Sequence, residues 1–99
     1  MKVIVLHEAE VEFWESVDYY EMQEPGLGVR FEEEVDRFIT KITADPLRPR
    51  LRQMGYRRVN LLMFRHYIAY ITRGDIVWIL AICHGHQRPE FWIKRLGNV

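Results

Sequence analysis

The uninterrupted apolar stretch Ile76–Cys83 is the feature that most limits the folds open to this chain. A strand that is apolar at every position, rather than at every second one, is typical of a sheet interior that is covered on both faces. Gly85 follows the stretch and breaks it. We therefore predict a central strand over residues 75–84, with a layer of structure on each side of it.

Two amphipathic helices are predicted ahead of this strand. Apolar residues recur at helical spacing over residues 9–20 and, more regularly, over residues 27–42. Pro25-Gly26 separates the two stretches. Asp45-Pro46 ends the second, because the residue before a proline is pushed out of helical geometry. The short turn makes the helices an antiparallel pair, and their acidic residues are expected on the solvated surface.

The remaining pattern completes an α+β fold. Short β-rich runs predict strands at residues 3–6, 57–64, 65–72 and 75–84, with a hairpin turn at Arg73-Gly74-Asp75. Pro89 is suited to open a last short helix over residues 90–96. The predicted order is β-α-α-β-β-β-(α), an antiparallel sheet packed by an N-terminal helical hairpin, in a single domain over residues 1–99.

Charge divides the chain into two halves. Residues 1–44 hold 11 acidic and 4 basic residues, whereas residues 45–99 hold 3 acidic and 10 basic residues. Two interpretations are open. The basic half meets a polyanion or an acidic partner chain, or the two halves fold together and neutralise each other.

Compartment and cofactors are constrained mainly by what the sequence lacks. The one cysteine, Cys83, cannot form an internal disulfide and is expected as a small buried side chain, so a reducing, cytoplasmic location is expected. The apolar N-terminus is too short for a signal peptide, and no run approaches the roughly 20 apolar residues of a membrane span. His84-Gly85-His86 has no matching second pair of metal ligands, and no nucleotide-binding glycine motif occurs. No metal or cofactor is therefore expected.

The segment after the central strand carries the most suggestive side chains. It places two histidines, Arg88, Phe91 and Trp92 at the end of a buried strand, where sites on sheets are often built. Arginine beside an exposed aromatic ring is what contact with RNA or DNA requires, because the charge meets phosphate and the ring meets a base. The alternative is that Phe91 and Trp92 dock the terminal helix onto the core.

The sequence also resembles the RelE/ParE superfamily of toxins over about residues 3–94. The resemblance rests on short motifs in the family's order, namely Tyr19-Tyr20, Pro25-Gly26-Leu27-Gly28, Arg30-Phe31, Glu34-Val35, Asp45-Pro46, Arg57-Arg58, Phe64, Ile68-Ala69-Tyr70, Ile82, His84-Gly85, Arg88-Pro89 and Phe91-Trp92. It implies a toxin of a type II toxin–antitoxin system, with growth arrest and plasmid stabilisation as its effects. Its partner would be an antitoxin whose disordered, often acidic tail folds upon the toxin.

The superfamily holds two mechanisms. RelE-like members cut messenger RNA on the ribosome by attack of the ribose 2′-hydroxyl on the adjacent phosphate, with a basic residue stabilising the charge. ParE-like members inhibit DNA gyrase. Aligned on Tyr70, a family arginine position holds Tyr67 and a family lysine position holds Asn60, although Arg58 occupies another basic position. This incomplete set favours gyrase inhibition. A metal-independent endoribonuclease acting on ribosome-bound mRNA and a non-toxic, antitoxin-binding member are the alternatives.

Two groups of candidate site residues follow. For a ribonuclease, the catalytic residues would be Arg58, Arg65, His84 and Arg88, with arginines binding phosphate and a histidine transferring protons. For binding of a nucleic acid or a protein target, the candidates are Arg48, Arg50, Arg52, Arg57, His86, Phe91, Trp92, Lys94 and Arg95.

Overall fold

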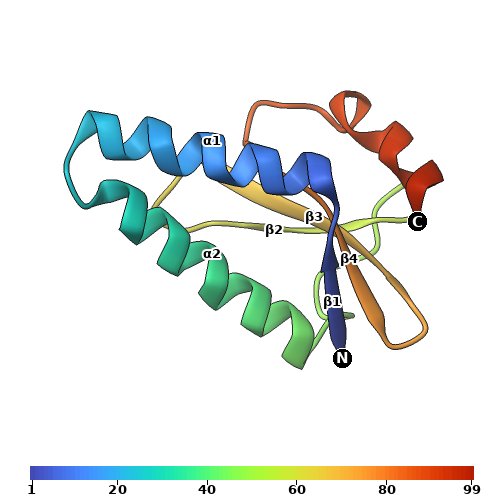
Figure 1. Ribbon diagram of the computed structural model, residues 1–99. Helices are drawn as coiled ribbons and strands as arrows, with labels where there is room; N and C mark the ends of the chain where they lie inside the picture. Colours follow the sequence, from blue (N-terminus) through green and yellow to red (C-terminus); the bar gives the residue numbers. More distant parts are fainter.

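The computed structural model describes all residues, 1–99, and has the predicted order of elements (Figure 1). The four strands form one sheet in the order β1-β4-β3-β2. Two 3-10 turns stand where the last helix is predicted, because the backbone leaves helical geometry at Trp92 (φ −128°). The α+β fold is thus confirmed. The elements are β1 (Lys2–Val5), α1 (His7–Gln23), α2 (Leu27–Ala44), β2 (Arg57–Asn60), β3 (His66–Arg73), β4 (Ile76–His84), η1 (Pro89–Phe91) and η2 (Ile93–Asn98).

β4 is the interior strand that its sequence predicts. It pairs antiparallel with β3 but parallel with β1, so the sheet is mixed and not wholly antiparallel as predicted. The one parallel pair arises because the helical hairpin and two further strands separate β1 from β4 in the chain. Ala69 opposes Ala81 while Tyr70 opposes Ile79, which leaves Leu80 as an extra residue in β4. Such a bulge shifts the alternation of backbone hydrogen bonds by one residue. It therefore changes which backbone groups of β4 point away from β3.

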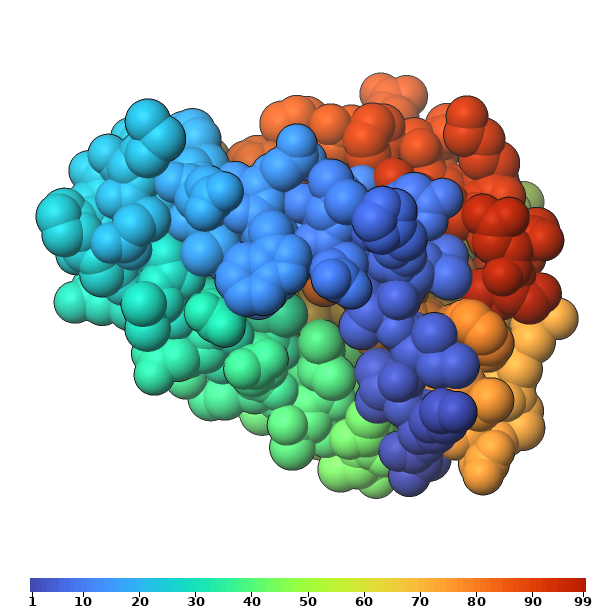
Figure 2. Space-filling view, in the orientation of Figure 1, coloured from blue at the N-terminus to red at the C-terminus, as the bar shows by residue number.

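The helical hairpin covers one face of the sheet (Figures 1 and 2). α2 supplies most of the buried surface from its helix pair, through Phe31, Val35 and Ile42. The two helices approach closely at Gly28, where a Cβ would lie 2.6 Å from the carbonyl oxygen of Val17. This close approach explains why a glycine stands in the first turn of α2. No helix is both long enough and apolar enough to span a membrane.

The C-terminal segment covers the opposite face. Trp92 is fully buried there and packs edge-on against Tyr56, with ring centroids 4.7 Å apart. Its indole N–H donates a hydrogen bond of 2.8 Å to the hydroxyl of Tyr67, which in turn donates to the carbonyl of Gln87 at 2.7 Å. β4 is therefore covered on both faces, and Cys83 is buried within it as expected.

Two further sequence-based predictions are wrong, one about where β2 ends and one about the exposure of the helical acidic residues. β2 ends at Asn60 rather than at residue 64, because the chain turns there and Leu61 donates its N–H to the carbonyl of His66 at 2.9 Å. The helical acids are not all solvated. Glu34 is only 2 % exposed, and the side chain of Glu12 is 15 % exposed. Both carboxylates accept backbone N–H groups of the sheet or its loops.

Candidate functional site

Most basic residues of the second half have no acidic partner in the first half. Only two ion pairs form in the whole chain. Glu12 pairs with Arg95 at 2.8 Å, and Glu34 approaches Arg37 at 3.9 Å. Only the first of these joins the two halves. The interpretation that the halves cancel each other is therefore not supported by direct pairing, and the exposed basic side chains remain Arg48, Arg50, Arg65, Arg73, Arg88 and Lys94.

The loop between α2 and β2 presents two of these exposed arginines, Arg48 and Arg50. Arg57 shapes the loop from within, since its guanidinium donates to the carbonyl oxygens of Pro49 at 2.7 Å and Leu47 at 3.4 Å. Arg48 and Arg50 are thereby left on the outside of the loop, and Arg52 is half-buried. Arg57 is a structural residue of the loop, whereas the exposed arginines are available to a partner.

Arg58 is held in one orientation on the second face of the sheet. Its guanidinium lies 3.7 Å from the ring centroid of Tyr67, and it donates two hydrogen bonds, of 2.7 and 3.1 Å, to the side-chain oxygen of Asn60. Stacking and a fixed acceptor reduce the entropy that an arginine loses when it binds an anion. Arg58 is therefore a half-buried cation that is held in place before any ligand binds.

Two grooves meet at Arg58. The larger, of about 650 Å³, lies between the end of α2 and β2 and is lined by the cationic Lys41, Arg48 and Arg58 above apolar side chains such as Phe38 and Ile42. The smaller, of about 470 Å³, is lined by Arg58, Arg65, Gly85 and the loop that joins β2 to β3. A ligand that suits the larger groove carries negative charge together with apolar groups.

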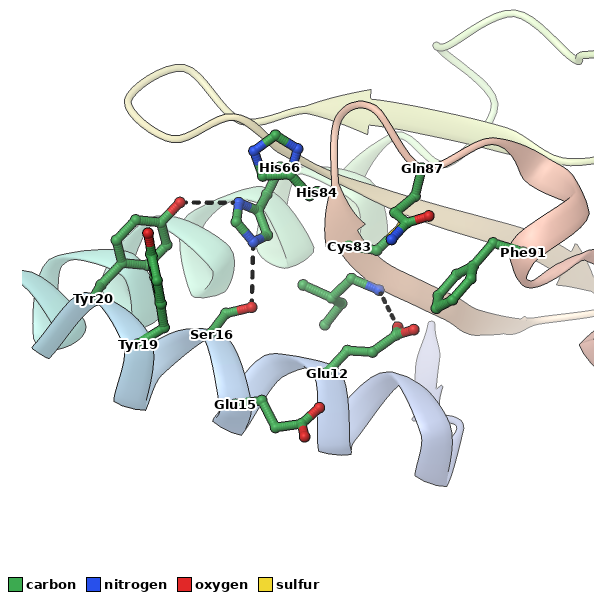
Figure 3. Close-up of a pocket in the computed structure, with 11 residues that line it drawn as sticks. Glu12, Glu15, Ser16, Tyr19, Tyr20, His66, Cys83, His84, Gln87 and Phe91 are labelled. Carbon is green, nitrogen blue, oxygen red and sulfur yellow. Dashed lines mark hydrogen bonds between the residues drawn. The ribbon is translucent and has the colours of Figure 1, made fainter. Parts of the chain in front are cut away.

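A third cavity, of about 440 Å³, lies between α1 and the end of β4 (Figure 3). At its base the imidazole of His66 hydrogen-bonds the hydroxyls of Ser16, at 3.2 Å, and Tyr20, at 3.3 Å. The rings of His66 and His84 are 5.4 Å apart, and His84 lies 4.2 Å from His86. The three histidines thus form a row that leads from the core to the surface.

His66, at the buried end of this row, is uncharged at neutral pH. Burial, and then the neighbouring His84, lower the pKa of His66 from 6.5 to about 4. Burial also lowers the pKa of His84, and His86 and Arg65 add to the effect. Burial raises the pKa of Cys83 to about 11, so this thiol stays protonated and is a poor nucleophile.

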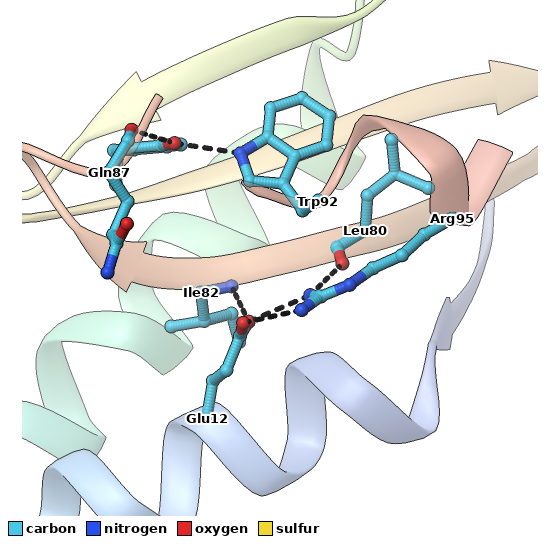
Figure 4. A network of polar contacts seen from close by, with 7 residues as sticks. Glu12, Leu80, Ile82, Gln87, Trp92 and Arg95 are labelled. Carbon is cyan, nitrogen blue, oxygen red and sulfur yellow. Dashed lines mark hydrogen bonds and ion pairs between the residues drawn. The ribbon is translucent and has the colours of Figure 1, made fainter. Parts of the chain in front are cut away.

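A side-chain bridge fixes the C-terminal segment beside this cavity (Figure 4). The carboxylate of Glu12 accepts the N–H of Ile82 at 3.1 Å and two guanidinium bonds from Arg95, at 2.8 and 3.1 Å. Arg95 also donates to the carbonyl of Leu80 at 3.0 Å. Burial alone would lower the pKa of Arg95, but the hydrogen bonds and charge of Glu12 outweigh it and raise the pKa. Glu12 and Arg95 thus provide hydrogen-bond partners for the Ile82 N–H and the Leu80 carbonyl, on the edge of β4 beyond the residues that pair with β1.

A solved structure shares this arrangement of sheet and helical hairpin. A chain in the structure of the chromosomal ParDE TA system from P. aeruginosa matches 85% of this chain and 95% of its own length, with a TM-score of 0.74. This chain has a RelE/ParE-like fold. The sequence identity is 16%, so the likeness concerns the fold alone. No protein-family model and no curated protein sequence matches this chain.

The RelE/ParE-like fold brings together only part of the predicted catalytic set. Arg58 and Arg65 line the same groove of about 470 Å³, and His84 lines the neighbouring cavity between α1 and β4. His66 lines both. Arg88 is exposed and lines neither of them. The four candidates therefore do not converge on one reacting phosphate.

Three of the predicted binding residues have structural partners instead. Trp92 is buried and cannot stack on a base, so its docking alternative holds. Arg95 is bound by Glu12, and Arg57 is bound by loop carbonyls. Phe91 is 48 % exposed and remains accessible at the rim of the cavity. The candidates that stay on the surface of this RelE/ParE-like fold are Arg48, Arg50, Arg52, His86, Phe91 and Lys94.

Sequence reasoning missed the residues that organise the site. His66 and Ser16 belong to no motif, and Tyr20 entered only through the Tyr19-Tyr20 motif, with no role assigned to it. The hydrogen bonds that join them link positions 46 and 50 residues apart. Glu12 stands beside Phe13 on α1 and has the composition of a solvated helix face. A weak signal existed only for His66, which directly follows Arg65 and precedes five apolar or aromatic residues, 67–71.

Proposed function

We propose that this chain is the toxin component of a type II toxin–antitoxin system. The observation that carries the proposal is the likeness of nearly the whole fold to a chain of a ParDE toxin–antitoxin structure. The exposed basic side chains without acidic partners support it, because an antitoxin tail of acidic composition would find counter-charges among them.

The groove of about 650 Å³ is the proposed binding site of the antitoxin. Lys41, Arg48 and Arg58 would pair with acidic side chains, while Phe38 and Ile42 would receive apolar ones. A disordered segment that alternates these two kinds of residue gains both electrostatic attraction and apolar burial when it folds into such a groove. Replacing Arg48 with Glu should therefore weaken antitoxin binding, and the effect should grow as salt is lowered.

DNA gyrase is the proposed target of the toxin. The separation of Arg88 from the other catalytic candidates and the burial of Trp92 argue for a protein that acts by binding rather than by cutting RNA. The second candidate is ribosome-dependent RNA cleavage. It is favoured by one observation, that Arg58 and Arg65 line a common groove beside His66, where two cations and an imidazole could meet a phosphate.

Pulse-labelling of protein and DNA synthesis, within minutes of inducing the chain without its antitoxin, separates these activities. Inhibition of DNA synthesis first is the expected result, with induction of the chain together with its antitoxin as the control. Inhibition of translation first would replace gyrase by the ribosome as the target, and Arg65→Ala would then be the first variant to assay. No effect on growth would contradict the toxin proposal and leave an antitoxin-binding protein without toxicity.

A further inference from the structure

The loop between β2 and β3 is built in an unusual way for a surface turn. Leu61 and Phe64 point inward and are 6 % and 9 % exposed, whereas Leu62 and Met63 point outward and are 82 % and 68 % exposed. The turn is closed by the hydrogen bond from Leu61 to the carbonyl of His66, at 2.9 Å. The burial of Leu61 and Phe64 anchors both ends of the turn, so the adjacent side chains of Leu62 and Met63 remain exposed to solvent.

A buried carboxylate fixes this turn in place. Glu34 is 2 % exposed on the inner face of α2, and both of its oxygens accept the backbone N–H of Met63, at 3.0 and 3.3 Å. Arg37 contributes only a distant contact of 3.9 Å and is itself largely exposed. Removing a carboxylate from water costs several kcal/mol unless its partners compensate. A costly buried group is therefore used to hold the residue whose side chain faces solvent.

The surroundings of the exposed pair are cationic. Leu62 and Met63 line the groove of about 470 Å³ together with Arg58 and Arg65. Single exposed apolar residues need no explanation, but an adjacent pair on a pinned turn, bordered by arginines, has the composition of an interface centre. Its rigidity also means that little conformational entropy is lost on binding.

We propose that Leu62 and Met63 form an apolar knob that inserts into a preformed pocket, with an acidic rim, on the folded protein that this toxin inhibits. The inference rests on the proposed function, since it names the contact element for the toxin's target. The projecting side chains of Leu62 and Met63 need a concave surface to bind. A folded protein can present such a pocket, whereas a disordered antitoxin tail has none before it binds. The acidic rim follows from the charge of Arg58 and Arg65 beside the knob.

The test compares growth arrest by the wild-type chain with that by the double variant Leu62→Ser/Met63→Ser, at equal amounts of folded protein. Both replaced side chains are exposed, so the urea midpoint of unfolding should equal that of the wild type. Antitoxin binding should persist, because neither residue lines the groove of about 650 Å³. Toxicity should fall at least tenfold in the inducer titration. Val11→Ser is the matched control, because it removes an exposed apolar side chain of α1 (41 % exposed) and should leave toxicity unchanged.

The outcomes separate the two proposals. A wild-type chain without toxicity contradicts the proposed function, and the inference falls with it. A toxic wild type with an equally toxic double variant contradicts the inference alone. A photo-reactive phenylalanine at position 62 gives the partner's class. Cross-linking to a folded target protein is expected, whereas cross-linking to the antitoxin or to a nucleic acid would overturn the assignment.

Discussion

Removal of the Glu12 carboxylate should destabilise the chain far more than its position on an acidic helix suggests. Glu12→Ala leaves the guanidinium of Arg95, whose side chain is 12 % exposed, without its anion. It also leaves the N–H of Ile82 without an acceptor. Breaking a largely buried pair from one side costs about 3–5 kcal/mol. Because both side chains keep some contact with water, we expect the lower end, about 3 kcal/mol.

Equilibrium unfolding in urea measures this loss directly. For an m-value of about 1.5 kcal/mol/M, a loss of about 3 kcal/mol lowers the unfolding midpoint by about 2 M. Glu15→Ala is the control, because Glu15 lies on the same helix, is exposed and forms no ion pair. Its midpoint should move by less than about 0.3 M, since exposed substitutions change stability by about 0.5 kcal/mol or less.

Substitution of the other partner, Arg95, tests the Glu12–Arg95 ion pair from its second side. Arg95→Met should cost less than Glu12→Ala, because Glu12 would still accept the N–H of Ile82 and the new side chain could pack on Phe91. The Glu12→Ala/Arg95→Met double variant should be more stable than the sum of the two single losses predicts, since it leaves neither charge unpaired. Equal midpoints for Glu12→Ala and Glu15→Ala would refute the reasoning, because the bridge would then contribute nothing.

Three further predictions concern the core. His66 has a lowered pKa in the folded state, about 4 against 6.5, so the unfolded chain binds more protons between these values. The stability that neutral His66 contributes is therefore complete above pH 6.5 and is lost as the pH falls towards 4, by about 3 kcal/mol. The urea midpoint of a His66→Asn variant should depend less on pH over that range. Trp92→Phe should cost about 1–2 kcal/mol in the same assay through loss of the indole hydrogen bond to Tyr67, and an unchanged midpoint would contradict the role given to that bond. Gly28→Ala should lower the thermal midpoint by forcing the two helices apart at a 2.6 Å contact, whereas Gly97→Ala, with no atom within 4 Å of the new methyl group, should not.

The parts of the fold that the sequence predicts are those with local causes. The bounds of α2 follow from its regular apolar face and from the Pro-Gly and Asp-Pro pairs that flank it. β4 follows from its unbroken apolar run. The end of β2 has no local cause, because residues 61–64 are as apolar as a strand and turn only where Glu34 and His66 bind their backbone. Those partners are distant in sequence, so no local pattern reports them.

The candidate site divides in the same way. Exposed arginines such as Arg48 and Arg50 could be predicted, since long charged side chains in a loop containing prolines reach water in almost any fold. Phe91 and Trp92 could not be told apart. They are adjacent and both aromatic, yet one is 48 % exposed and the other is fully buried. The difference depends on the phase of a short 3-10 turn, which is set by the Glu12–Arg95 bridge and by the hydroxyl of Tyr67. If the chain is the toxin proposed above, a loss of toxicity in Trp92→Ala would therefore report loss of packing, whereas the same loss in Phe91→Ala at unchanged stability would report a contact with the partner.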